Sequence, residues 1–132
     1  MAAITAFPEI PDTMHGAFGT EVTKTASADI LGGQAVQINS NGTVAPATAS
    51  TQKIIGVALY DIPAGTEGAI RVVGVARCAN GDGATAITAG AAVTAGALGG
   101  VVAHSTGTAL GIALEPIAGG ATGLVALGVF TA

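Results

Sequence analysis

The chain has little charge and few aromatic side chains, and both shortages limit what it can do alone. Only 9% of its 132 residues are charged, 3% are aromatic and 50% are apolar. Charged residues make up about a quarter of an ordinary soluble domain. Because a lone globule of this composition lacks the polar groups to cover its own surface, we expect other chains to cover part of it.

Basic residues are especially scarce. Lys24, Lys53, Arg71 and Arg77 are the four positive side chains, and the formal net charge is -4. No cluster of them is dense enough to neutralise a run of phosphates. We therefore expect no direct binding of nucleic acid.

Cysteine is scarce too, since Cys78 is alone. A single thiol allows neither an intramolecular disulfide nor a zinc site built from thiolates. We interpret Cys78 as a small buried apolar residue in preference to a reactive thiol. The opening residues MAAITAFPEIPD lack the charged start and long apolar run of a secretory signal, which favours synthesis in a cytoplasm.

Residues 83–114 contain no acidic or basic side chain other than His104, so they raise the question of a membrane span. The segment is rich in Gly, Ala and Thr rather than Leu, Ile and Phe. Gly pairs interrupt it, and Lys, Arg and Trp anchors do not flank it. We expect no membrane contact.

The chain repeats itself. A shift of 57 positions aligns Ile30, Gly33 and Val36 with Ile87, Gly90 and Val93, and shifts of 55 and 54 continue the match as far as the final strand. We place the two repeats at about 30–76 and 87–130. Because a small β unit cannot bury its apolar face alone, a second copy is expected to supply the opposing face.

Short runs rich in Val and Ile, bounded by Gly, Pro, Asn and Asp, predict strands in both repeats. The runs are AVQI, KIIGVALY and AIRVVGVAR in the first repeat and AAVT, TALGIALE and LVALGVF in the second. In each repeat a short valine run lies between the first and the second of these. No apolar stripe of helical period persists, so we predict an all-β fold of about eight to ten strands. The two halves would pack as a small β-sandwich or a distorted barrel, which the sequence does not distinguish.

Residues 1–18 belong to neither repeat, and we interpret them as an extended N-terminal arm before a single β domain at 19–132. The arm contains the pairs Phe7-Pro8 and Ile10-Pro11. Proline and the residue before it favour extended backbone. The large apolar side chains of the arm must pack either on the β body or on a partner, and we favour the partner.

Motifs that bind phosphate or metal are incomplete. Residues 19–25 place a Gly five positions before Lys24-Thr25, but Thr23 stands where the phosphate loop needs a Gly. Residues 80–83, Asn-Gly-Asp-Gly, lack the further carboxylates of a calcium loop, so a tight turn is favoured. We predict no metal and no cofactor.

Catalytic groups are equally sparse. His15 and His104 are the two imidazoles, and neither has a carboxylate or Cys at ligand spacing. A catalytic triad could be drawn from Ser105, His104 and Asp82, but the sequence has no G-x-S-x-G elbow to position the serine. We predict that the chain is not an enzyme and has no small-molecule substrate.

The order and doubling of four segments resemble the capsid cement, or head-decoration, proteins of tailed bacteriophages. The segments are TASADILGGQAVQI, KIIGVALYDIPAGTEGAIRVVGVA, ITAGAAVTAG and ALGIALEPIAGGATGLVALGVF. The resemblance covers roughly residues 20 to 130. It implies a small β-rich structural protein of the virion, made in the host cytoplasm, that stabilises an icosahedral head.

The resemblance also implies the partners. Such a protein would bind the outer surface of the shell of major capsid protein as a homotrimer at local three-fold positions. The arm would grip the capsid, and from its position in the chain we name as capsid-contact candidates Phe7, Pro8, Ile10, Pro11 and Phe18.

The alternative function is a surface-displayed β module that binds carbohydrate or a receptor. Sugar sites need exposed aromatic rings for stacking. Tyr60 is the single tyrosine of the chain, so it is the residue on which this alternative depends.

Overall fold

A computed structural model describes residues 19–50, 52–81, 85–96, 100–105 and 107–131. These residues contain nine β-strands and no helix. The strands are β1 (Gly19–Thr25), β2 (Ala35–Ile38), β3 (Val44–Pro46), β4 (Ile54–Ala58), β5 (Glu67–Ala79), β6 (Ala92–Ala95), β7 (Val101–Ala103), β8 (Thr108–Ala113) and β9 (Thr122–Thr131).

The strand order is symmetric about its centre. It runs β3-β2-β4-β5-β9-β8-β6-β7, every pairing between strands is antiparallel, and β1 pairs with β5 off this path. The first half of β5 pairs with β1 and its second half pairs with β9. Strand β5 therefore closes one β unit and opens the next.

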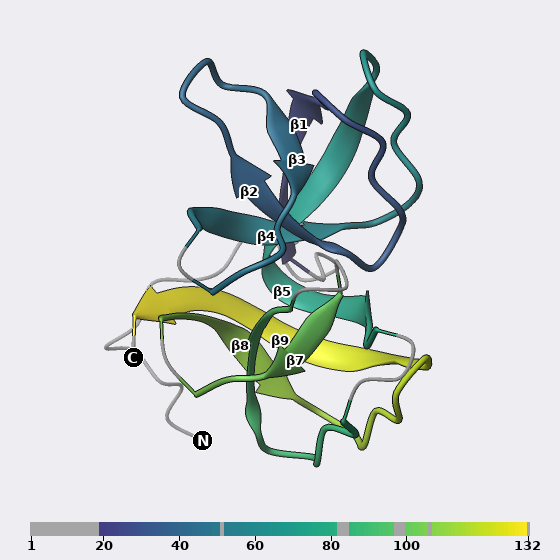
Figure 1. Cartoon of the computed structure of the whole chain (residues 1–132), viewed down its shortest axis with the longest axis vertical. Coiled ribbons are helices and arrows are strands. Elements are labelled where there is room, and N and C mark those ends of the chain that lie inside the picture. Colours follow the sequence, from purple (N-terminus) through teal and green to yellow (C-terminus); the bar gives the residue numbers. More distant parts are fainter. Residues whose placement is uncertain (1–18, 51, 82–84, 97–99, 106, 132) are drawn as a thin grey trace, which may run out of the picture.

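The registers show that the two units are built alike. Val36 lies opposite Gly56 as Val93 lies opposite Gly111. The β1·β5 ladder, in which Val22 pairs with Ile70, corresponds to the β5·β9 ladder, in which Ala76 pairs with Val125. We call residues 19–73 the first unit and residues 74–131 the second unit. Figure 1 shows the first unit above the second, with β5 running through both.

Each unit curls into an antiparallel half-barrel. The residue after β1, Ala26, forms a parallel bridge with Val44 of β3, and Asn80 after β5 forms the same bridge with Val101 of β7. These bridges bring the segment that follows β1 next to β3 at the edge of the first unit, and the segment that follows β5 next to β7 at the edge of the second unit. The all-β class is thus confirmed, and the sheet takes the barrel-like arrangement rather than the sandwich.

Two glycines allow this curl because the backbone comes too close for a side chain. A Cβ on Gly56 would lie 2.1 Å from the carbonyl oxygen of Arg71, and a Cβ on Gly111 would lie 2.1 Å from that of Ala126. Only glycine fits where a neighbouring strand approaches in this way.

Two apolar clusters form the core. The first lies inside the first unit and consists of Ala26, Ile30, Val36, Val44, Ala58, Ile62 and Ile70. The second combines the interior of the second unit with side chains from the outer surface of β2 and β4, among them Ala35, Ile54 and Val57. Since β4 also contacts β8 and β9, the first unit packs directly on the second.

Most predicted strands are present, and one was missed. The runs AVQI, KIIGVALY, AIRVVGVAR, TALGIALE and LVALGVF overlap β2, β4, β5, β8 and β9, in that order. Strand β1, GTEVTKT, contains the incomplete phosphate-loop motif and is not predicted by the apolar runs. Its alternation of polar residues with a single Val lacks the apolar run on which the prediction relied.

No helix among the described residues is long and apolar enough to cross a membrane. The predicted arm, residues 1–18, lies outside the described residues.

Candidate functional site

Several titratable side chains of the described residues form local hydrogen bonds. His104 follows β7, is half-buried and donates from Nε2 to the carbonyl oxygen of Gly107 at 3.0 Å. The described residues contain no group of three or more His, Cys, Asp or Glu side chains placed to hold a metal ion. His15 and Asp82, two of the residues weighed for such chemistry, lie outside the described residues.

Cys78 is fully buried in the second core cluster, as the sequence predicted. Burial raises the pKa of its thiol from 9.0 to about 12, because the thiolate would lose its hydration. The neutral thiol is therefore the form present near neutral pH, and it behaves as a small apolar side chain.

The surface offers a different kind of candidate, namely large apolar side chains exposed to solvent. Among the described residues these are Leu31, Tyr60, Val73, Val75, Ile112 and Leu114, with exposed fractions between 36% and 57%. They occur on both units and on β5 between them. Because isolated exposed apolar side chains are normal on a soluble protein, only those that adjoin further apolar surface point to a contact with other chains.

At one end of the first unit, Leu31 lines a cavity of about 220 Å³ together with Asp29, Ile30, Asp61, Ile62 and Pro63. The two carboxylates hold the loops in place rather than face a ligand. Asp61 Oδ1 accepts the backbone N–H of Gly32 at 2.8 Å, and Asp29 Oδ1 accepts that of Ala64 at 2.8 Å. This end therefore presents an apolar surface fixed by acidic caps.

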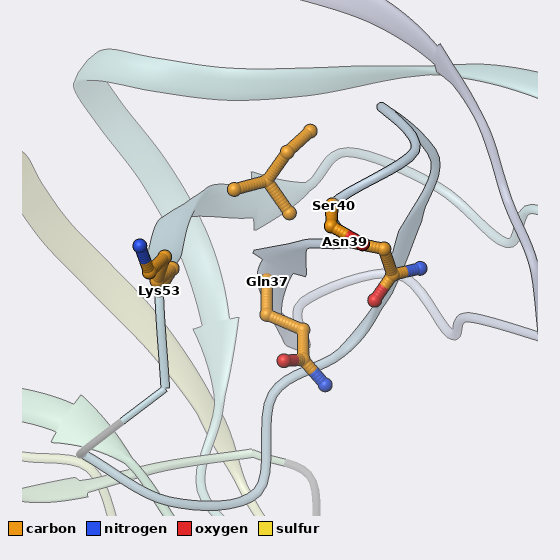
Figure 2. Close-up of a pocket in the computed structure, with 5 residues that line it drawn as sticks. Gln37, Asn39, Ser40 and Lys53 are labelled. Carbon is orange, nitrogen blue, oxygen red and sulfur yellow. The ribbon is translucent and has the colours of Figure 1, made fainter.

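The concave side of the first unit carries a second apolar surface. Its half-buried members, which we call the open face, are Val22, Ile38, Ile55 and Val72. Beside it is a cavity of about 560 Å³ lined by Gln37, Ile38, Asn39, Ser40 and Lys53. Figure 2 shows the polar side chains of this cavity, with Lys53 on the segment that leads into β4.

The second unit has the same surface, but there it is covered. The positions equivalent to the open face, which we call the closed face, are Ala76, Ala95, Leu110 and Leu127, all at most 6% exposed. They share a core cluster with Ala35, Ala47, Ile54 and Val57 of the first unit. The first unit therefore covers the second, whereas nothing among the described residues covers the first to the same extent.

The capsid-contact candidates of the sequence all lie outside the described residues: Phe7, Pro8, Ile10, Pro11 and Phe18. Of the exposed apolar side chains, the sequence singled out Tyr60 alone. The open face was missed. Ile55 aligns with Leu110 and Val72 with Leu127, so a comparison of the repeats identifies these as matching apolar positions, but it does not show which of them is covered.

Comparisons with known proteins agree with a structural role. A family model described as phage cement protein matches residues 14–129. Among solved structures, the N base of the head fiber gp8.5 of bacteriophage phi29 is similar, with a TM-score of 0.63 and 17% identity over 83% of this chain and 93% of that one. No curated protein matches the chain.

The head fiber base shares the fold with this chain, and at this identity the likeness extends no further. The family match spans nearly all of the chain and includes both repeats. It agrees with the resemblance carried by the doubled segments and assigns a structural role at a phage capsid. The chain belongs to the phage cement protein family.

Proposed function

We propose that the chain stabilises an icosahedral phage head by binding the outer surface of the shell of major capsid protein as a homotrimer. It would be made in the host cytoplasm and added to the shell after expansion. This role needs no catalysis, cofactor, membrane, nucleic acid or small-molecule substrate.

The observation that carries the proposal is the apolar surface left exposed on both units. Apolar surface that stays in water is less favourable than buried apolar surface by roughly 25 cal/mol per Å², so each such side chain would stabilise a contact that covers it. Leu31 and Tyr60 are more than half exposed on the first unit, and Leu114 is 51% exposed on the second. Symmetry mates and an underlying shell would cover these side chains together.

Low charge supports the same proposal. Chains that pack face to face must strip water from any charge at the contact, which is expensive unless the charge is paired. With 9% charged residues, this chain pays little of that penalty. Attachment should therefore depend weakly on salt compared with a complex held by ion pairs.

The test uses purified full-length chain and expanded shells that lack it. We expect sedimentation to give the mass of three chains, and we expect the chain to bind the shells in both low and moderate salt. A chain that ignores the shells would overturn the proposed function.

Residues 1–18 are proposed to be the capsid-gripping arm, through Phe7, Pro8, Ile10, Pro11 and Phe18, and residues 19–132 the single β domain that they serve. Deletion of residues 1–18 should leave the β body folded and weaken attachment to shells. If the truncated chain fails to fold, the arm belongs to the core instead.

Carbohydrate binding is the second candidate, favoured by the 53% exposure of Tyr60. The phenol oxygen of Tyr60 accepts the backbone N–H of Ala69 at 3.0 Å, which holds the ring against β5. A glycan screen with Tyr60→Ala as the control tests this candidate. Binding that disappears in the variant would support it, and a blank screen would remove it.

A further inference from the structure

The inference concerns what covers the open face of the first unit. The covering side of the first unit, which packs on the closed face of the second, consists of Ala35, Ala47, Ile54 and Val57, all at most 4% exposed. Figure 1 shows β4, which carries two of these residues, at the junction between the units.

The second unit repeats this covering side, and there it is partly uncovered. Ala35 pairs with Val57 as Ala92 pairs with Ile112. The backbone N–H of Ala47 donates to Ala35 as that of His104 donates to Ala92, both at 2.8 Å.

The equivalent side, which we call the free face, is therefore Ala92, His104, Ala109 and Ile112. Val57 is 0% exposed whereas its equivalent Ile112 is 42% exposed. Ala92 and His104 are half-buried, and Ala109 stays buried.

Two equivalent glycines show the same difference between the units. Gly33 and Gly90 occupy equivalent turns, with φ of +91° and +85°. A Cβ on Gly33 would lie 3.1 Å from the backbone nitrogen of Ala79, and Gly33 accepts the N–H of Ala79 at 3.0 Å. A Cβ on Gly90 would meet nothing within 4 Å. The contact made by the first unit is thus left unmade by the second.

We infer that the free face of one copy packs on the open face of a second copy, repeating between chains the contact that joins the two units within a chain. Each chain contains both kinds of surface twice. The covering side of the first unit and the closed face of the second are in contact inside the chain. The open face of the first unit and the free face of the second are the pair that remains for contact with other chains. Such a head-to-tail contact uses two different surfaces, and it closes into a ring when its rotation permits. The inference rests on the proposed homotrimer and names the surfaces that form it.

Charge substitutions on the two surfaces test the inference in the full-length chain. Ile55→Asp disrupts the open face and Ile112→Asp disrupts the free face. Each variant alone should sediment as a single chain, with self-association weakened at least ~30-fold, as expected for a lost central contact. Ala118→Asp, at an exposed position outside both faces, should associate like the unmodified chain.

Mixing the two variants separates a head-to-tail contact from other occupants. The intact free face of the Ile55→Asp chain can still bind the intact open face of the Ile112→Asp chain, so the mixture should form a one-to-one pair and stop there. If the open face binds itself or residues 1–18, Ile112→Asp associates normally and the mixture forms no such pair, which overturns the inference.

Folding of each variant is checked by its thermal transition. Should Ile55→Asp fail to fold, Ile38→Asp replaces it, because Ile38 also borders the open cavity beside β2. Shell binding is measured separately. Copies that associate through these faces but ignore shells would overturn the proposed function alone. A chain that binds shells as a trimer, with Ile55→Asp and Ile112→Asp still associating normally, would overturn this inference alone.

Discussion

The two units follow one path and differ in what lies against them. Ile62 and Ile117, each 1% exposed, fill the same interior position. Each forms an antiparallel bridge with an isoleucine earlier in its own unit, Ile30 and Ile87. Ile55 and Leu110 also occupy one position, yet Leu110 is fully buried and Ile55 is not. The comparison shows that the interior of a repeat follows from its own sequence, whereas the burial of its outer positions depends on its neighbours.

The units also differ in charge at the strand β5 that they share. Glu21 pairs with Arg71 in the β1·β5 ladder, and their side chains form an ion pair. The equivalent positions in the β5·β9 ladder are Val75 and Ala126, which carry no charge. The first unit thus has a charged cross-strand pair at the position where the second unit has an apolar one. In the second unit, Val75 of this pair is 36% exposed.

The largest effect is expected from a methyl group at the close approaches. Gly56→Ala and Gly111→Ala each place a Cβ 2.1 Å from a carbonyl oxygen of the next strand. Each should lower the free energy of unfolding by ~3 kcal/mol or more, because the backbone itself must move. Chemical denaturation measures the loss.

Gly128→Ala is the matched control for these glycines. It lies in β9, and a Cβ there meets nothing within 4 Å. It should change stability by at most about 0.5 kcal/mol. If all three variants are equally stable, the close approach of the neighbouring strand is not what requires glycine at positions 56 and 111.

The next effect separates the covered surface from the open one. Leu110→Ala should cost about 3 kcal/mol, because it leaves a cavity beneath the first unit. Ile55→Ala should cost about 1 kcal/mol in dilute solution, since its side chain is already half-exposed. Equal losses in chains kept monomeric by dilution would contradict the difference in burial.

A pH titration also distinguishes the units, through Cys78. Its folded pKa, about 12, lies above the value of 9.0 for the free thiol, so the neutral form is favoured by folding. The resulting stabilisation is complete below pH 9 and is lost as pH rises toward 12. Cys78→Ala should flatten this part of the stability curve. A thiol reagent that labels native chain rapidly at pH 8 would show that the second unit opens by itself.

Interior positions should respond alike. Ile62→Val and Ile117→Val remove the same methylene from equivalent sites that are both 1% exposed. Each should cost about 1 kcal/mol. Unequal costs, measured by the same denaturation experiment, would show that the two interiors are less alike than their registers indicate.

The smallest effect is expected at the ion pair of the first unit. Glu21 is 43% exposed, so Glu21→Gln should lower stability by less than about 1 kcal/mol. Arg71 keeps its hydrogen bond to the carbonyl oxygen of Val75 at 2.8 Å. A larger loss, or a strong dependence on salt, would make the charged cross-strand pair a principal support of the first unit.

Much of the fold was predictable from short apolar runs. The segment AVQI is β2 itself, and TALGIALE contains all of β8. Strand β1 was not, because GTEVTKT gains its place from pairing with β5 rather than from apolar periodicity. The pairing of β5 with both β1 and β9 was also not predictable, because the sequence of a 13-residue strand does not show how many strands pair along its length.

The candidate surface was predictable only in part. The shortage of charge predicted that other chains cover this one, but it names no face. Ile55 and Leu110 are similar residues in matching segments, so the sequence predicts the same degree of burial for both side chains. Their difference arises from the packing of β4 on β8 and β9, which is a tertiary contact.

An image of the decorated shell at a resolution that separates strands tests the central claim most directly. The account predicts density for three copies above each occupied site, with the surface around Ile55 of one copy in contact with the surface around Ile112 of the next. Density in which both surfaces face solvent, or in which a single copy sits alone on the shell, would contradict it.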